Sequence, residues 1–424
     1  MTDTNASLWE RSQQVLIGGV NSPVRAFLSV GGSPFVVERA VGSRIYDVDG
    51  NEYLDYVQSY GASILGHADP KVIEVIRQAA LAGTTYGAPT RGEVELAETI
   101  VDRIPGVEMV RMTSSGTEAT MAAIRLARGH TGRNKVIKFA GNYHGHSDSL
   151  LAAGGSGVAN QGLTGSAGVT PGSVADTVVA PYNVVPDVDA DTAVVVVEPV
   201  AANMGLVEPE PGFLRGLRDA CDAAGALLMF DEVITGFRLA HGGAVEWSGV
   251  TPDIWCFGKV IGGGLPVGAF GAPREIMATV APLGPVYHGG TLSGNPLATA
   301  AGLEVLRQLT PEAHERLNRI AESLQAGLVE AVSGAGVAVT VPRVGPLLGI
   351  FFTDQPVRNY DDAKVAADNG RYPTFFHSML DQGIAMAPGA YEALFPSLAH
   401  SAADIARTIE AAAVAAQRVA ADHG

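Results

Sequence analysis

Short apolar segments alternate with segments of helical period through the middle of this chain, and this alternation constrains the fold more than any other feature. The apolar segments are Val107–Met112, Lys135–Phe139, Thr192–Val197, Ala226–Phe230 and Ile254–Phe257, and those of helical period are Pro70–Ala82, Glu93–Ile104, Thr117–Arg128 and Gly212–Ala224. Strands that alternate with helices build a mostly parallel sheet with helices on both faces. The run AVVVV at 193–197 suits a strand buried on both faces. We therefore predict an α/β fold.

The two ends of the chain have a different pattern. Residues 1–57 contain an amphipathic stretch, Leu8–Leu16, and then a predicted β-hairpin with Asp49-Gly50 as its turn. Residues 309–424 hold two predicted helices and a strand, at Pro311–Val332, Ala402–Ala421 and Gly349–Phe352. We predict that the two ends pack together as a smaller α/β domain beside a large domain of residues 58–308.

The composition argues against several classes of protein. With 28 Lys+Arg against 44 Asp+Glu the net charge is −16, and no basic cluster is present, so we expect no nucleic-acid partner. Cys221 and Cys256 are the only cysteines, too few for a disulfide framework, which favours a reducing cytoplasm. The first residues lack the apolar core of a signal peptide, and no apolar run approaches the ~20 residues that span a bilayer. We expect a cytoplasmic enzyme.

Two polar residues directly follow apolar strands, and together they indicate a cofactor. Lys259, one of only five lysines, follows DIWCFG, and Asp231 follows ALLMF. Both therefore lie at the sheet edge where α/β proteins bind ligands. Alone, the lysine could extend its amine into solvent and the acid could cap a helix. Pyridoxal phosphate needs both, a lysine that binds its aldehyde and an acid at its pyridine nitrogen.

A third segment suits a phosphate group. Ser115, Gly116 and Thr117 lie between a predicted strand and a predicted helix, where free N–H groups and hydroxyls attract anions. The alternative is a plain capping turn, since Ser-x-x-Glu boxes are common. The glycine spacing matches neither a Walker loop nor a dinucleotide fingerprint.

An aromatic residue and two histidines follow the strand Lys135–Phe139. Tyr143 could stack on a planar cofactor. His144 and His146 have no third ligand at a suitable spacing, so we expect hydrogen-bonding roles and no metal.

The chain resembles the aminotransferase class III family of fold type I pyridoxal-phosphate enzymes nearly from end to end. The resemblance is carried by GGVNSPVRAF, LGHADP, SSGTEATMAAIRLARGHTGR, YHGHSD, GGSGVA, EPVAANMG, DEVITGFR, FGKVIGGGLPVGAFG, GTLSGNP and RYPTFFHSML. GGVNSPVRAF and GTLSGNP resemble the aminomutase branch in particular. The resemblance implies a seven-stranded, mostly parallel sheet in the large domain, and a pyridoxal or pyridoxamine phosphate cofactor. It implies intramolecular amino transfer that converts (S)-4-amino-5-oxopentanoate to 5-aminolevulinate for tetrapyrrole synthesis.

Two alternatives remain open at this point. One is an intermolecular ω-aminotransferase that acts on an amine or a β-amino acid. The other is a binding or scaffold protein on the same fold, which intact Lys259 and Asp231 disfavour.

The resemblance also implies roles around the cofactor. Lys259 would hold the cofactor and carry protons, and Asp231 would pair with the pyridine nitrogen. The cofactor ring would lie between Tyr143 and Val233, with its phenolic oxygen near Asn203. The phosphate would bind at Ser115, Gly116 and Thr117, and Thr291 of the partner subunit in a homodimer would join them.

On the substrate side the resemblance implies four residues, Ser22, Arg25, Tyr60 and Glu392. Arg25 would bind the substrate carboxylate, and Glu392 would repel 2-oxo acids. Tyr60 and Ala202 stand where the family usually has tryptophan and glycine. The Gly/Ser-rich segment 147–174 matches a mobile lid, and the substrate could be handed over by glutamyl-tRNA reductase.

Overall fold

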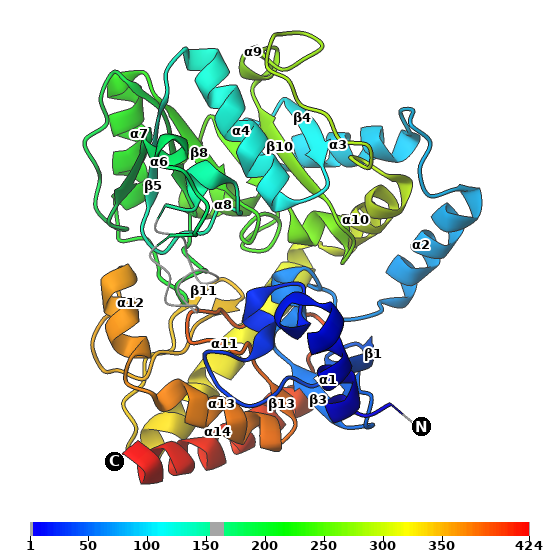
Figure 1. Cartoon of the computed structure of the whole chain (residues 1–424), viewed down its shortest axis with the longest axis vertical. Coiled ribbons are helices and arrows are strands. Elements are labelled where there is room, and N and C mark those ends of the chain that lie inside the picture. The colour runs from blue at the N-terminus through cyan, green and yellow to red at the C-terminus, as the bar shows by residue number, and fades with distance from the viewer. Residues whose placement is uncertain (1–2, 153–164, 424) are drawn as a thin grey trace.

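A seven-stranded sheet with helices packed on both faces forms the centre of the computed structural model, which describes residues 3–152 and 165–423 (Figure 1). Its strand order is β4-β10-β9-β8-β7-β5-β6. The strands are β4 (Met109–Thr113), β5 (Lys135–Phe139), β6 (Thr177–Ala180), β7 (Thr192–Val197), β8 (Leu227–Asp231), β9 (Ile254–Phe257) and β10 (Gly268–Ala272). Only β10 runs antiparallel to its neighbours, so the predicted mostly parallel α/β sheet is confirmed.

Side chains of β7 point alternately to the two faces, which explains its uninterrupted apolar sequence. Val194 and Val196 pack with helix α4 (Gly116–Thr131) on one face. Val195 and Val197 pack on the other face with helix α7 (Phe213–Ala224). Because successive residues of a strand alternate in direction, a strand covered by helices on both sides must be apolar throughout.

Helices α2 (Pro70–Ala82), α3 (Arg91–Arg103) and α10 (Pro296–Gln308) extend this large layer beside β4 and β10 (Figure 1). The bounds of α2, β5, β7 and β9 agree with the prediction. Strand β10 was not predicted, because its sequence GAFGA is rich in glycine. Gly268 is needed there, since a Cβ would lie 2.3 Å from the carbonyl oxygen of Ser115.

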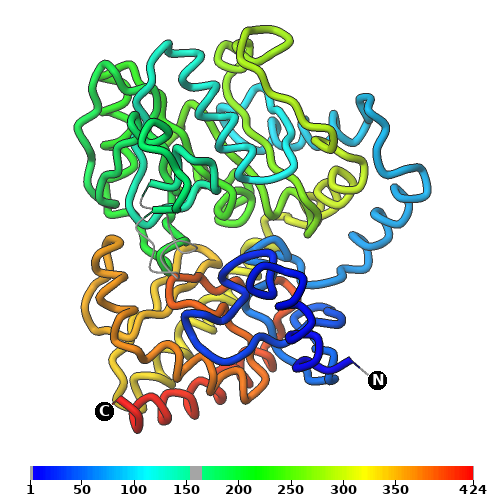
Figure 2. Tube along the Cα trace, viewed as in Figure 1, coloured from blue at the N-terminus to red at the C-terminus, as the bar shows by residue number. Residues whose placement is uncertain are grey.

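A second sheet joins the two ends of the chain. Strands β1 (Val37–Val41), β2 (Arg44–Asp47) and β3 (Glu52–Asp55) are antiparallel, with Asp49-Gly50 between β2 and β3 as predicted. Strand β3 also pairs in parallel with β13 (Ile384–Ala385). Figure 2 shows the N-terminal and C-terminal segments side by side in the lower half of the molecule. The domain boundaries at 57/58 and 308/309 stay predictions.

Helices cover this second sheet. Of the described helices in this half of the molecule, the two longest are α11 (Pro311–Gly334) and α14 (Ala402–His423), and α1 (Asn5–Val15), α12 (Tyr360–Ala367) and α13 (Arg371–Asp381) lie with them (Figure 1). The short helices α6 (Pro171–Val174), α8 (Gly243–Ser248) and α9 (Arg274–Met277) belong to the large layer, where α9 contacts β4 and β10. The predicted strand Gly349–Phe352 is wrong: Phe351 forms only an isolated bridge with Thr340, and the regular pairing lies in β11 (Arg343–Val344) and β12 (Leu347–Leu348). Of the predicted lid, residues 153–164 lie outside the described residues.

Candidate active site

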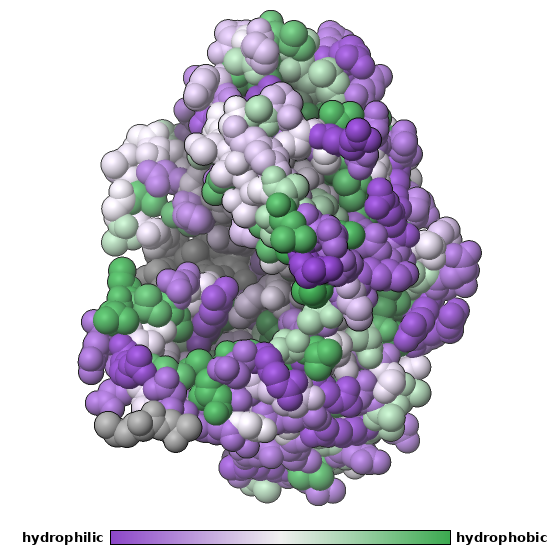
Figure 3. All heavy atoms as spheres, turned by 90° about the vertical axis from the view of Figure 1, so that its right-hand side faces the viewer, coloured by the Kyte–Doolittle hydropathy of each residue, from purple (hydrophilic) through white to green (hydrophobic). Residues whose placement is uncertain are grey.

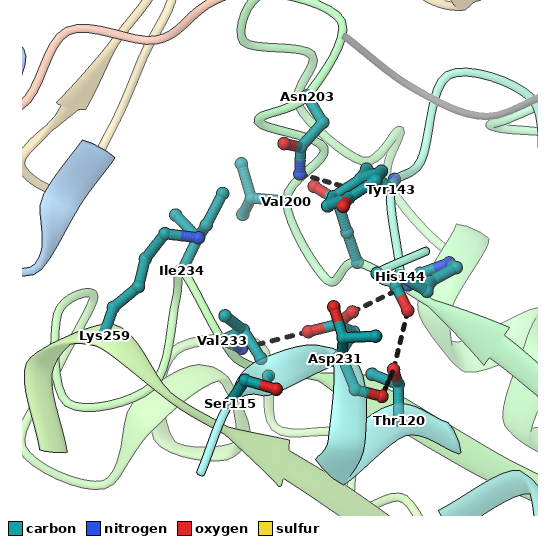
Figure 4. Close-up of a pocket in the computed structure, with 14 residues that line it drawn as sticks. Ser115, Thr120, Tyr143, His144, Val200, Asn203, Asp231, Val233, Ile234 and Lys259 are labelled. Carbon is teal, nitrogen blue, oxygen red and sulfur yellow. Dashed lines mark hydrogen bonds and ion pairs between the residues drawn. The ribbon is translucent and has the colours of Figure 1, made fainter. Parts of the chain in front are cut away.

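A cavity of about 220 Å³ lies at the C-terminal edge of the large sheet. Its walls come from the loops after β4, β5, β7, β8 and β9, so one small space brings together five distant segments (Figure 4). The lining residues are Ser115, Gly116, Thr117, Thr120, Tyr143, His144, Gly145, Glu198, Val200, Asn203, Asp231, Val233, Ile234 and Lys259. Parallel strands end at the same edge, which is why residues predicted separately at strand ends meet here.

Asp231 is the last residue of β8, and its buried carboxylate is held on both oxygens. Oδ1 accepts the backbone N–H of Val233 at 3.1 Å, and Oδ2 lies 2.7 Å from Nδ1 of His144. Burial lowers the pKa of His144, so the ring is neutral and donates from Nδ1 to the carboxylate. The predicted hydrogen-bonding role of His144 therefore has a specific partner, and the two contacts fix the orientation of the Asp231 side chain.

Lys259 begins the short helix η5 (Lys259–Gly262) just after β9, and its amine points toward the cavity (Figure 4). Its backbone is left-handed, with φ 46°. Burial lowers the pKa of the amine, while the carboxylates of Asp231 and Glu198 oppose that shift. A desolvated amine loses its proton more easily and becomes a better nucleophile.

The start of α4 forms a cradle of unpaired donors. Ser115 caps the helix, because its Oγ accepts the N–H of Glu118 at 3.1 Å, so the capping alternative is also correct. The N–H groups of Gly116 and Thr117 stand in the first turn, where no helical carbonyl can accept them. Gly145, with φ 84°, packs so closely that a Cβ would lie 2.6 Å from Thr117 Oγ1. The cradle fits an anion.

Glu198 is a cavity residue that the sequence analysis missed. It follows β7 directly, the same strand-end signal that identified Asp231. Its Oε1 accepts the N–H of Tyr143 at 2.7 Å and Nδ2 of Asn203 at 2.9 Å, and its Oε2 accepts the N–H of Ala202 at 2.8 Å. Glu198 thus fixes the aromatic residue and the amide that line the cavity.

The protonation of Glu198 makes folding stability depend on pH. Burial raises the pKa of Glu198 to about 7, from 4.5 in the unfolded chain. Between these values the folded protein keeps a proton that the unfolded chain loses, so stability falls as pH rises through that window. Glu198 should lower the free energy of unfolding of the wild type by about 3 kcal/mol between pH 4.5 and 7.5, and we expect Glu198→Gln to abolish this decrease. Urea unfolding at several pH values measures the slope of the free energy of unfolding against pH.

Exposed Glu208 provides the matched control, and Glu208→Gln should keep the wild-type slope. Equal slopes for wild type and Glu198→Gln would contradict an elevated pKa at Glu198. Glu232, whose pKa burial also raises to about 7, contributes a slope of the same sign in every variant.

The remaining predicted residues fall into two groups. Tyr143, Val233 and Asn203 line the cavity with Lys259 and Asp231. The residues predicted for the substrate lie beyond its lining: Ser22, Arg25, Tyr60 and Glu392. Electrostatic interactions nevertheless connect the two groups. Glu392 interacts with Lys259, and both Glu392 and Arg25 interact with Tyr60. Thr291 is exposed in a turn, outside the cavity of its own chain.

Across residues 3–152 and 165–423, no group of three or more His, Cys, Asp or Glu side chains is arranged to hold a metal ion. None of the helices in these ranges is long and apolar enough to cross a membrane.

The sheet and the lysine–aspartate cavity define a fold type I pyridoxal-phosphate transferase. The family model for aminotransferase class III matches residues 28–415, and the chain belongs to this family. It is 53% identical to glutamate-1-semialdehyde 2,1-aminomutase 2 of Bacillus licheniformis, with 98% of each chain covered. An ω-transaminase from Sphaerobacter thermophilus superposes with a TM-score of 0.90 at 34% identity, covering 98% of this chain and 97% of that one. A transaminase with PLP bound gives a TM-score of 0.88 at 33% identity, covering 100% and 99%.

Proposed function

We propose that the chain is a glutamate-1-semialdehyde 2,1-aminomutase, which converts (S)-4-amino-5-oxopentanoate to 5-aminolevulinate with pyridoxal or pyridoxamine phosphate. The 53% identity to a curated aminomutase over 98% of the chain carries the choice of reaction. The cavity that joins Lys259 to Asp231 supports the choice of cofactor.

The cavity residues fit this cofactor. The donors of Gly116 and Thr117 suit its phosphate, and a Cβ at Gly145 would fill the space beside them. Asp231 would hold a proton on the ring nitrogen, and Tyr143 and Val233 would lie against the ring. When bound, the cofactor supplies an aromatic system that accepts the negative charge left after a neighbouring carbon loses a proton.

Within this scheme each side chain has a defined task. The Lys259 amine would bind the cofactor and move a proton between two substrate carbons, which burial favours by lowering the pKa of the amine. His144 keeps Asp231 oriented from behind through the 2.7 Å contact. Asn203, held by Glu198 at 2.9 Å, would reach the phenolic oxygen.

The substrate side rests on the residues around Tyr60. Arg25 would bind the substrate carboxylate through its planar donor fork. Glu392 places negative charge near Lys259, which would disfavour a second carboxylate and so an external 2-oxo acid. Ser22 precedes helix η2 (Pro23–Ala26), which carries Arg25.

An assay without an amino donor tests the reaction. Because the amino group stays within one molecule, we expect the purified enzyme to form 5-aminolevulinate from the semialdehyde alone. The product can be measured by its condensation to a coloured pyrrole. An absolute requirement for an added amine or 2-oxo acid would overturn the proposal.

That outcome would support the second candidate, an intermolecular ω-aminotransferase. The TM-score of 0.90 with the Sphaerobacter ω-transaminase favours keeping this alternative. Tyr60 and Ala202, which differ from the usual family residues, stand near the proposed substrate side.

We also propose a cytoplasmic homodimer in which Thr291 of the partner subunit completes the phosphate site. Thr291 is exposed, and nearby Tyr287 and Leu292 expose 75% and 52% of their surfaces. Figure 3 shows hydrophobic patches between hydrophilic residues on the side of the molecule that carries α2. This homodimer would receive its substrate directly from glutamyl-tRNA reductase.

A further inference from the structure

A buried arginine lies just outside the cavity, with no carboxylate to balance it. Arg238, on the loop after β8, exposes only 1% of its surface. Burial alone lowers its pKa to about 9. Within residues 3–152 and 165–423, neither Nε nor Nη1 has a hydrogen-bond partner. A buried unpaired cation destabilises a fold, so packing does not account for this residue.

Among the residues that the structure describes, the hydrogen-bond partner of this guanidinium is the backbone of a distant turn. Nη2 donates to the carbonyl oxygen of Gly61. The ring centroid of Phe395 lies 5.3 Å from the guanidinium carbon. A Cβ at Gly61 would lie 2.8 Å from Phe395 and 3.4 Å from Nη2, so the two side chains clamp this glycine.

The clamped turn has an unusual backbone. Gln58, Ser59 and Tyr60 have φ values of 44°, 53° and 54°, and Gly61 has 94°. Residues other than glycine adopt a left-handed backbone only at a cost in free energy, so this turn needs support from its surroundings. Asp55 supports its start by accepting the N–H of Gln58 at 3.1 Å, and Arg238 holds its end.

This turn packs against the helix that begins with Lys259. Helix η3 (Gln58–Gly61) contacts helix η5, which begins with Lys259. Tyr60, on the same turn, interacts electrostatically with Glu392 and Arg25. Arg238 is therefore connected to both the amine and the proposed substrate side.

We propose that Arg238 is a positioning residue that fixes the turn carrying Tyr60 against the turn carrying Lys259. Its charge has a second effect: burial is the main cause of the lowered pKa of the Lys259 amine, and the charge of Arg238 adds to it against the opposing carboxylates of Asp231, Glu198 and Glu392. Only the part that concerns substrate binding rests on the proposed function.

Three variants separate the two effects. Arg238→Met removes both the charge and the hydrogen bond, Arg238→Lys keeps the charge, and Gly61→Ala disturbs the turn while leaving Arg238 in place. The first readout is the pH midpoint of the visible absorption of the lysine-bound cofactor in the holoenzyme. We expect it to rise in Arg238→Met and to stay unchanged in the other two.

The second readout is the split between KM and kcat for the semialdehyde. We expect KM to rise about tenfold in all three variants, with kcat changed less than about threefold, because Tyr60 loses its position. Arg133→Met is the matched control. Arg133 also donates to backbone carbonyls, those of Thr192, Ala224 and Gly225, but at the opposite edge of the sheet. It should keep the wild-type midpoint and KM.

A wild-type midpoint and KM in Arg238→Met would overturn the proposal. If that variant does not fold, wild-type KM values in both Arg238→Lys and Gly61→Ala overturn it. A purely structural role would lower the melting temperature without moving the midpoint. The midpoint needs no substrate, so failure of the donor-free assay would refute the proposed reaction and leave this test intact.

Discussion

Replacing Lys259 with alanine should abolish turnover, with a loss of about 10⁴-fold or more. Among the described residues that line the cavity, Lys259 is the only lysine. Its burial and lowered pKa equip the amine both to bind an aldehyde and to accept a proton. Cofactor binding should weaken but persist, because the donors of the α4 cradle and Asp231 remain. Borohydride reduction followed by mass spectrometry should attach the cofactor to the wild type and not to the variant.

Lys364→Ala is the matched control. Lys364 lies on α12, where its exposed amine pairs with Asp361 at 2.7 Å. This variant should keep wild-type activity and retain covalent cofactor after reduction. Activity above one hundredth of the wild type in Lys259→Ala, at equal cofactor content, would remove Lys259 from the mechanism.

The second large effect is expected at Asp231, where Asp231→Asn should reduce kcat by about 10²–10³-fold. The amide keeps the shape of the carboxylate but loses the negative charge that would hold a proton on the ring nitrogen. His144 would also lose its charged partner at 2.7 Å. Rate measurements and the cofactor dissociation constant, followed by fluorescence, should both show the loss.

Glu232→Gln is a close control for this variant. Glu232 is the next residue and is equally buried, but its carboxylate accepts the N–H of Ala244 at 2.7 Å and does not line the cavity. Cofactor affinity should stay near that of the wild type. Comparable losses in both variants would show that any buried carboxyl change on this loop disturbs the site, contrary to a specific role for Asp231.

Local sequence patterns were enough to predict most of the large sheet and several residues of its cavity. Strands such as β7 and β9 are recognisable because a buried strand needs an apolar run. Lys259 and Asp231 could be singled out because each follows such a run, and parallel strands end at one edge. Glu198 carries the same signal and was missed, although it begins the segment EPVAANMG, because Asn203 was the residue of that segment to which the resemblance assigned a cofactor contact.

The parts that could not be predicted depend on distant packing. Strand β10 forms despite its glycines, because its neighbours β4 and β9 supply the hydrogen bonds and Gly268 must pass close to Ser115. The prediction of a strand at Gly349–Phe352 was wrong, because a short apolar run does not show whether a partner strand lies beside it.

By itself the sequence determined the alternation of strands and helices, the family, and the amine and acid at two strand ends, because these follow from local periodicity and short motifs. Tertiary structure alone decided which groups meet. It brought Glu198 to Tyr143 and Asn203, and it joined Arg238 to Gly61 across 177 positions of the chain. Burial also set the protonation of these groups, since the pKa of a side chain depends on the solvent and charges that folding places around it.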